Sequence, residues 1–105
     1  LYLSPFRSAI ASGVDTVMIN HIQYPNLDPS SPATLSKKIV TDVLRIELKY
    51  TREILSDDLE MGAIQEAYGI EDAVVRARLA GCSLLLVCQS PILQDRAWKA
   101  LTERV

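Results

Sequence analysis

The sequence predicts an α/β fold with parallel strands. Short apolar runs at 14–22 and 83–88, and a segment at 51–56 that carries Ile54 and Leu55, are expected to be strands, and segments with apolar residues at helical spacing separate them. Near-continuous apolar runs are expected of parallel strands that are covered on both faces, and strands that alternate with helices form right-handed crossover units. Because a three-stranded parallel sheet has exposed edges, such a sheet is normally part of a larger sheet or a closed barrel.

The composition is that of an ordinary globular domain. The chain has 105 residues, of which 49% are hydrophobic and 23% are charged, and its net charge is -2. This balance gives no basic field for nucleic acid or anionic lipid, so neither is an expected partner. No apolar run approaches the roughly 20 residues that span a bilayer. The first residues have no feature of a signal peptide, and a chain that begins with Leu1 is expected to be part of a longer protein.

The first predicted elements are a helix and a strand. A helix is predicted from Pro5 to Ala11, because Pro is tolerated in the first helical turn and apolar residues follow at helical spacing. Gly13 is a natural end for this helix. The β-branched run at 14–22 then predicts a strand, which delivers two polar residues, Asn20 and His21, to its carboxyl end.

A long loop and a second helix precede the next strand. Residues 23–33 contain three Pro residues, two Ser residues and one Asp residue, a composition that sustains neither regular structure. Loops of this length on a rigid scaffold are often functional. Ser36 is a plausible N-cap for a helix that runs through 39–48. The second strand is predicted at 51–56.

The last third of the chain predicts a short helical stretch, two helices and a strand. The short stretch covers 62–68, and a helix follows at 71–80 that Gly81 closes. The third strand is predicted at 83–88. Ser90 and Pro91 have the pattern of an N-cap and a first helical residue, so the last helix is expected to run to about Arg104. Trp98 on this helix is expected to take part in core or helix packing.

Two adjacent carboxylates, Asp57 and Asp58, end the second strand and make the stretch 54–62 the candidate catalytic segment. Chemistry collects at the carboxyl ends of parallel strands in open sheets and in barrels. Neighbouring residues of a strand point to opposite faces, so Asp57 would share its face with Leu55, and Asp58 would share its face with Ser56. The periodicity does not decide which face is the interior. A structural alternative is that both carboxylates simply begin a helix.

A magnesium-binding phosphoacceptor domain is a different function that paired acids at a strand end would suit. It requires a third Asp and a Lys at neighbouring strand ends, where this chain has Asn20-His21 and Cys88-Gln89, so this hypothesis is rejected. Cys82 and Cys88 are six apart and lack metal-ligand spacing. Free thiols are expected, and no metal or cofactor is predicted.

Eight motifs follow one another along nearly the whole chain. They are Leu3-x-Pro5-Phe6-Arg7-x-Ala9-Ile10, Gly13-Val14-Asp15-x-Val17-Met18, His21-Ile22-x-Tyr24-Pro25, Asp28-Pro29, Pro32-Ala33-Thr34-Leu35-Ser36, Leu44-Arg45, Ser56-Asp57-Asp58-Leu59-Glu60-Met61-Gly62-Ala63-Ile64 and Ala80-Gly81-x-x-Leu84-Leu85-Leu86-Val87-Cys88. In this order they resemble the motifs of glycoside hydrolase family 3, and within it those of the β-N-acetylhexosaminidase branch. The resemblance implies a (β/α)8 TIM barrel, with residues 1–105 as the C-terminal portion of the catalytic barrel domain, holding strands six to eight. The missing N-terminal half of the barrel would be its partner.

The resemblance also implies a function, that of a retaining exo-β-N-acetylglucosaminidase acting on cell-wall muropeptides or chitin-type oligosaccharides. Asp57, the first acid of the S-D-D motif, would be the nucleophile, with Asp58 and Ser56 supporting it. The acid/base of this branch is a His on an earlier loop, which lies outside this chain, so His21 is not that residue. The alternatives are a β-glucosidase or β-xylosidase of the same family, or an inactive barrel fragment.

The remaining site residues are expected from their positions in the motifs. His21 is placed near the wall of the sugar pocket, Asn20 could add a polar contact, and Tyr24 is a stacking candidate. Met61 is either core filler or a wall of the site, and Glu60 is expected to be solvated. Family members have a Gly-containing turn where this chain has 48–54, which puts the local turn geometry in doubt. A cytoplasmic bacterial location is expected over an exported one.

Overall fold

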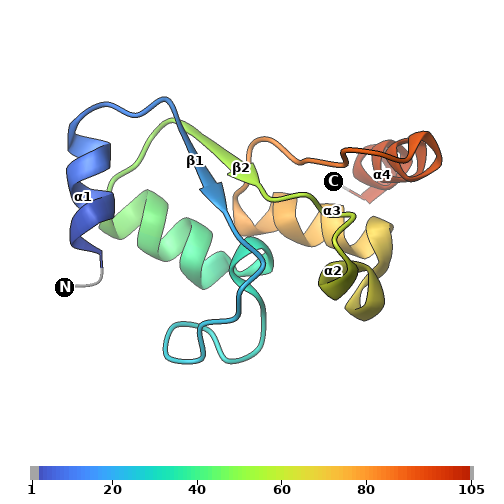
Figure 1. Cartoon of the computed structure of the whole chain (residues 1–105), viewed down its shortest axis with the longest axis horizontal. Coiled ribbons are helices and arrows are strands. Elements are labelled where there is room, and N and C mark those ends of the chain that lie inside the picture. The colour runs from blue at the N-terminus through green and yellow to red at the C-terminus, as the bar shows by residue number, and fades with distance from the viewer. Residues whose placement is uncertain (1–2, 105) are drawn as a thin grey trace.

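The computed structural model describes residues 3–104, in which helices and strands alternate along the chain (Figure 1). The elements, in chain order, are α1 (Ser4–Ala11), β1 (Thr16–Ile19), the 3-10 helix η1 (Ala33–Leu35), the π-helix η2 (Lys38–Glu47), β2 (Glu53–Ser56), α2 (Gly62–Ala67), α3 (Gly69–Ala80) and α4 (Pro91–Arg104). The predicted α/β class is confirmed. None of the helices in this part of the chain has both the length and the apolar character of a bilayer-spanning helix.

The sheet contains two parallel strands within residues 3–104. Strand β1 pairs with β2 so that Thr16 lies opposite Glu53 and Ile19 lies opposite Ser56, which confirms the predicted parallel orientation. The prediction of a third regular strand at 83–88 is wrong. This segment runs beside β2, but it contributes a single bridge, between Leu84 and Leu55.

Two serine hydroxyls explain why the 83–88 segment forms no regular ladder. In a parallel ladder each hydrogen bond joins two backbone groups. Here the Ile54 N–H donates to the Ser83 hydroxyl over 2.9 Å, and the Leu86 N–H donates to the Ser56 hydroxyl over 2.9 Å. Side chains therefore replace backbone acceptors on both sides of the bridge. Between them, the Leu84 N–H donates to the Ile54 carbonyl and the Ser56 N–H donates to the Leu84 carbonyl, over 3.0 and 2.9 Å, which confines the backbone pairing to one bridge.

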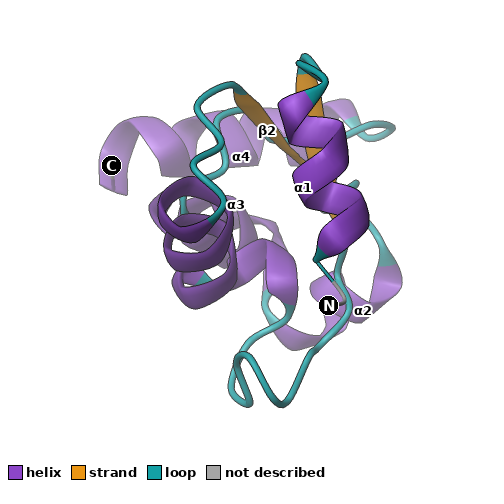
Figure 2. Cartoon of the chain, turned by 90° about the vertical axis from the view of Figure 1, so that its left-hand side faces the viewer, coloured by secondary structure: helices purple, strands orange, loops and turns teal. Residues whose placement is uncertain are grey.

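The core lies between one face of the sheet and the helices. In β2, Ile54 and Ser56 are fully buried, whereas Glu53 is exposed and Leu55 is half-buried. Helices η2 and α3 lie below the strands in Figures 1 and 2 and supply most of the covering side chains. These include Val40, Leu44, Ala73, Val74 and Ala77.

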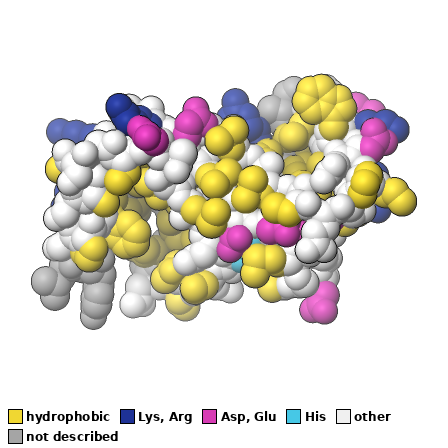
Figure 3. Space-filling model, turned by 45° about the horizontal axis from the view of Figure 1, so that its top comes forward, with side chains coloured by type: hydrophobic (Ala, Val, Ile, Leu, Met, Phe, Trp, Pro, Cys, Tyr) yellow, Lys and Arg dark blue, Asp and Glu magenta, His cyan; other side chains and the backbone are white. Residues whose placement is uncertain are grey.

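The opposite face of the sheet is open. Met18 of β1 is 53% exposed and Leu84 is 46% exposed, and both lie level with Leu55 through the strand register and the bridge. Figure 3 shows apolar side chains gathered over the middle of the molecule, with acidic side chains beside them. In a closed barrel this face would be the interior, because the helices cover only the other one.

The turn before β2 keeps a left-handed residue although it lacks glycine. Helix η2 ends with the Leu48 N–H donating to the Val43 carbonyl over 2.8 Å, five residues back. The next residue, Lys49, has a φ of 58°, the conformation for which glycine is favoured. Arg45 then donates to the Tyr50 carbonyl over 3.2 Å. The turn whose geometry the sequence put in doubt therefore forms without glycine, with Lys49 in the left-handed conformation and a hydrogen bond from Arg45 to the Tyr50 carbonyl.

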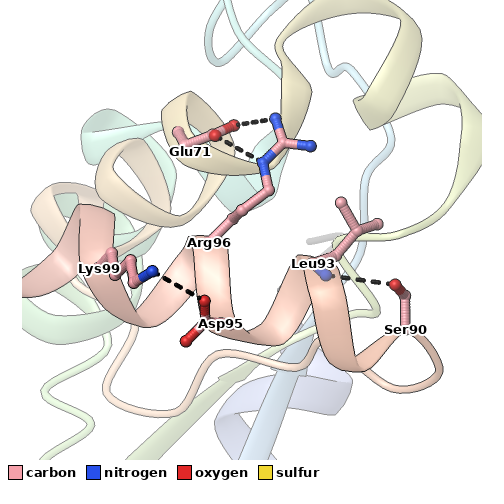
Figure 4. Close-up of polar contacts among 6 residues, drawn as sticks. All are labelled: Glu71, Ser90, Leu93, Asp95, Arg96 and Lys99. Carbon is pink, nitrogen blue, oxygen red and sulfur yellow. Dashed lines mark hydrogen bonds and ion pairs between the residues drawn. The ribbon is translucent and has the colours of Figure 1, made fainter.

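Helix α4 is capped as predicted, and an ion pair between side chains joins it to α3. The Ser90 hydroxyl accepts the Leu93 N–H over 3.2 Å, and Pro91 is the first helical residue. Arg96 donates to both carboxylate oxygens of Glu71, over 2.7 and 2.8 Å. Figure 4 shows this pair and the Ser90 cap. Trp98 was predicted to take part in core or helix packing, and the core part of this prediction is wrong, because Trp98 is 66% exposed.

Candidate active site

Asp57 lies at the end of β2 on the side of the open face. The alternation of β2 buries Ile54 and Ser56 against the helices, so Leu55 and Asp57 point to the other side. The Asp57 N–H donates to the Ile19 carbonyl over 2.9 Å, which continues the pairing with β1 by one residue. Within residues 3–104, the carboxylate of Asp57 accepts one hydrogen bond, from the Asp58 N–H over 2.8 Å. Its second oxygen is available to a ligand.

The Asp58 side chain accepts hydrogen bonds from backbone N–H groups around it. Its Oδ1 accepts the N–H of Glu60 over 3.0 Å and the N–H of Cys88 over 3.3 Å. Its carbonyl oxygen lies 2.8 Å from Nε2 of His21. These contacts join the loop after β2 to the ends of both neighbouring segments. The two adjacent acids therefore differ in what they offer, since Asp58 holds the loop and Asp57 faces open space.

The loop 57–61 is fixed on every side, and Glu60 contributes to this. Leu59 is fully buried, and its N–H donates to the Leu86 carbonyl over 2.8 Å. The Glu60 carboxylate accepts the N–H groups of Gln89 and Ser90, the second over 2.9 Å. The prediction that Glu60 is merely solvated is wrong. Its carboxylate accepts two backbone N–H groups directly before α4, and its negative charge interacts favourably with the dipole of that helix.

His21 is held by hydrogen bonds at both ring nitrogens. Its Nδ1 lies 2.6 Å from the Thr34 hydroxyl, and its Nε2 lies 2.8 Å from the Asp58 carbonyl oxygen. The Thr34 hydroxyl also contacts the Asn20 carbonyl, and the Thr34 N–H donates to the same oxygen over 3.1 Å. Thr34 is fully buried. Periodicity could not predict this role, since Thr34 lies thirteen residues beyond His21 in the chain.

The other predicted site residues lie around the mouth of this site. Asn20 donates through Nδ2 to the Tyr24 hydroxyl over 3.1 Å and accepts the Ile22 N–H over 3.1 Å. Tyr24 is 38% exposed and Met61 is 46% exposed. Of the two readings of Met61, core filler does not fit this exposure. Asn20 and Tyr24 contact each other, whereas Met61 ends the Asp57 loop, directly before α2.

Asp28 organises the long loop that carries Tyr24. Its carboxylate is 4% exposed and accepts the Ser36 hydroxyl over 2.6 Å, and the Ser30 N–H and hydroxyl over 2.9 and 2.8 Å. The hydrogen bond from Ser36, followed by those from Ser30, lowers the pKa of Asp28 to about 2. Because Ser36 also accepts the Ile39 N–H over 3.1 Å, this carboxylate joins the loop to the start of η2.

Both cysteines are free thiols. Burial raises the pKa of Cys82 to about 11. Desolvation, and then the negative charge of Asp58, raise the pKa of Cys88. Neither thiol is therefore activated as a nucleophile at neutral pH. No group of three or more His, Cys, Asp or Glu side chains in the described part of the chain has the geometry of a metal site.

The parallel strands, the helices on one face and a free carboxylate at a strand end define a piece of an α/β barrel enzyme domain. The family model described as the glycosyl hydrolase family 3 N terminal domain matches residues 1–105. The chain belongs to this family, as the sequence motifs predicted.

Relatives of known name agree with this assignment. The chain is 43% identical over 103 residues to a protein named beta-hexosaminidase from Stenotrophomonas maltophilia strain K279a, a match that covers 97% of this chain and 30% of that protein. A solved family 3 beta-N-acetylglucosaminidase from Paenibacillus sp. str. FPU-7 superposes with a TM-score of 0.96 and 43% identity, over 100% of this chain and 20% of that one. The beta-N-acetylglucosaminidase of Thermotoga maritima gives 0.81 and 34%, over 94% and 23%. The chain thus spans less than a third of the length of these relatives.

Proposed function

We propose that this chain supplies the nucleophile and one wall of the active site of a retaining β-N-acetylglucosaminidase. The single observation that carries the proposal is the position of Asp57, whose carboxylate faces the open side of the sheet and has one oxygen without a hydrogen bond from residues 3–104. The names of the relatives support the choice of substrate class. Residues 1–105 would be the C-terminal portion of the catalytic barrel domain, and the remaining strands would come from the rest of the protein.

The proposed reaction proceeds in two steps through a covalent glycosyl-enzyme. Asp57 attacks the anomeric carbon of a terminal β-linked N-acetylglucosamine, while a proton donor from another part of the protein protonates the leaving oxygen. Water then hydrolyses the ester with that same group acting as base. A carboxylate suits this task because the transition state resembles an oxocarbenium ion, which a nearby anion stabilises.

The test compares two matched substitutions in the full-length protein, Asp57→Asn and Asp58→Asn, with an aryl β-N-acetylglucosaminide as substrate. Asp57→Asn should lower kcat by several orders of magnitude, because a neutral amide does not attack the anomeric carbon. Asp58→Asn retains the oxygen that accepts from Glu60 and Cys88, so the loss should stay within about tenfold, the difference between a charged and a neutral acceptor. Equal losses, or the reverse order, would contradict the assignment. Turnover of an aryl β-glucoside in preference would shift the substrate class to the family's glucosidases.

A further inference from the structure

We propose that His21 is a positioning residue for the nucleophile, acting through the peptide of Asp58, an inference that rests on the proposed function of Asp57. The contact joins the end of β1 to the loop after β2, across 37 positions in the sequence. It is the point at which a side chain from the neighbouring strand holds the residue directly after the nucleophile. No sugar contact by His21 is needed for this role.

The chemistry of the partners fixes which ring nitrogen carries a proton. A carbonyl oxygen only accepts hydrogen bonds, so Nε2 of His21 must donate to the Asp58 carbonyl over 2.8 Å. On the other side, Nδ1 lies 2.6 Å from the oxygen of the Thr34 hydroxyl, whose single proton is directed to the Asn20 carbonyl. Thr34 is fully buried and is itself anchored to the Asn20 carbonyl. The imidazole thus connects the buried Thr34 to the catalytic loop at Asp58 through one hydrogen bond at each ring nitrogen.

The orientation of residue 58 sets the carboxylate of residue 57. The N–H of Asp58 donates to Oδ1 of Asp57 over 2.8 Å, so a rotation at residue 58 removes the bond that orients the nucleophile. Within the loop, the Met61 N–H donates to the same Asp58 carbonyl over 3.2 Å and the Glu60 N–H donates to the Asp58 side chain over 3.0 Å. Two groups from outside the loop also oppose this rotation. His21 holds the Asp58 carbonyl from β1, and the Cys88 N–H holds the Asp58 side chain from the 83–88 segment over 3.3 Å. The Cys88 contact is the longer of the two, which leaves His21 as the firmer restraint.

The family resemblance placed His21 near the wall of the sugar pocket, where it could contact the substrate directly. The geometry favours a different role, because both ring nitrogens already have partners within the chain. A hydrogen bond from either nitrogen to a sugar hydroxyl would require that one of these partners be given up. The ring is half-buried, which also limits the area that a ligand can reach.

The experiment uses four variants of the full-length protein. His21→Gln keeps an amide N–H near the position of Nε2, and His21→Leu has the bulk without a donor. Thr34→Val removes the hydroxyl that supports Nδ1. Thr41→Val is the matched control, because its hydroxyl makes a comparable bond, 2.6 Å to the Ala80 carbonyl, that joins η2 to the end of α3 and not to the catalytic loop. The measurements are kcat and KM for the aryl β-N-acetylglucosaminide, and amide hydrogen exchange of residues 57–61.

A positioning role predicts that His21→Leu lowers kcat by about 100-fold, the usual effect of displacing a catalytic group by about 1 Å, while KM changes less than about threefold. His21→Gln should recover a substantial part of kcat, Thr34→Val should give a smaller loss, and Thr41→Val should behave as wild type. The amides of 57–61 should exchange about tenfold faster in His21→Leu. A raised KM at unchanged kcat would overturn the inference in favour of substrate contact, as would unchanged kcat and exchange.

The exchange measurement separates this inference from the proposed function. If the wild-type protein does not hydrolyse the substrate, the proposed function fails, and the exchange of 57–61 in the His21 variants still decides whether His21 holds the loop. If His21→Leu does not fold, His21→Gln and Thr34→Val decide the question by the same readouts. Equal effects of Thr34→Val and Thr41→Val would then overturn the inference.

Discussion

Replacement of Ser56 by Ala should loosen the segment that follows Gly81 without touching the nucleophile. Ser56 is fully buried, and its hydroxyl accepts the Leu86 N–H over 2.9 Å. The substitution removes one oxygen and leaves the backbone of β2 intact. It therefore tests whether a side chain has replaced the ladder bond at this position.

The expected cost follows from the donor left behind. A buried N–H that loses its acceptor costs about 1–3 kcal/mol. Because Leu86 is half-buried, water reaches the freed group in part, and about 1–2 kcal/mol is expected. This corresponds to a roughly 5- to 30-fold change in an equilibrium constant.

The assay is amide hydrogen exchange of the full-length protein, supported by urea unfolding. The Leu86 amide should exchange about 5- to 30-fold faster in Ser56→Ala. Ser12→Ala is the control, since the Ser12 hydroxyl donates to the Ser8 carbonyl over 2.9 Å at an exposed helix end, and such changes stay within about 0.5 kcal/mol. Unchanged exchange at Leu86 would refute the role given to Ser56 in ending the ladder.

Three further predictions concern the supports of the site. The pKa of Asp28 is lowered to about 2, so its contribution to stability is present above about pH 4 and is lost as the pH falls toward 2; urea midpoints of Asp28→Asn between pH 5 and pH 3 should fall less steeply than those of wild type, and parallel curves would contradict this. Gly81→Ala places a Cβ 2.7 Å from Oγ1 of Thr41 at a φ of +123° and should cost about 1–3 kcal/mol in thermal unfolding, more than Gly13→Ala, where φ is +86° and the space is open; equal costs would show that the contact with Thr41 is harmless. Glu60→Gln loses one of two acceptors at the start of α4 and should destabilise the protein by about 1.5–3 kcal/mol, whereas the exposed Glu66→Gln should not; similar urea midpoints for the two would argue against the cap.

The sequence was informative where local patterns decide structure. The alternation of apolar runs and helical segments predicted the parallel strands, and the caps at Ser36 and Ser90 were visible from residue type and spacing. The strand at 83–88 was overpredicted because an apolar run does not show where its backbone donors go. That depended on the hydroxyls of Ser56 and Ser83, which lie outside the apolar pattern.

The site was predictable only in part, for physical reasons. Strand alternation left Asp57 and Asp58 equivalent until the buried face of β2 was known, and the family motif alone favoured Asp57. The bonds that distinguish the two acids come from His21 and Cys88, which are 37 and 30 positions from Asp58. Contacts between residues so far apart leave no periodic signal in a single sequence. Trp98 was misjudged for a related reason, since its burial depends on what packs against α4.

The most direct test of the central claim is to identify the residue that becomes covalently attached to the sugar. The full-length protein would be incubated with a fluorinated N-acetylglucosaminyl substrate that forms the glycosyl-enzyme quickly and hydrolyses slowly, then digested and analysed by mass spectrometry. The account predicts one added sugar, on Asp57, and no label in Asp57→Asn. A label on Asp58 or elsewhere, or turnover with no covalent intermediate in an active enzyme, would contradict it.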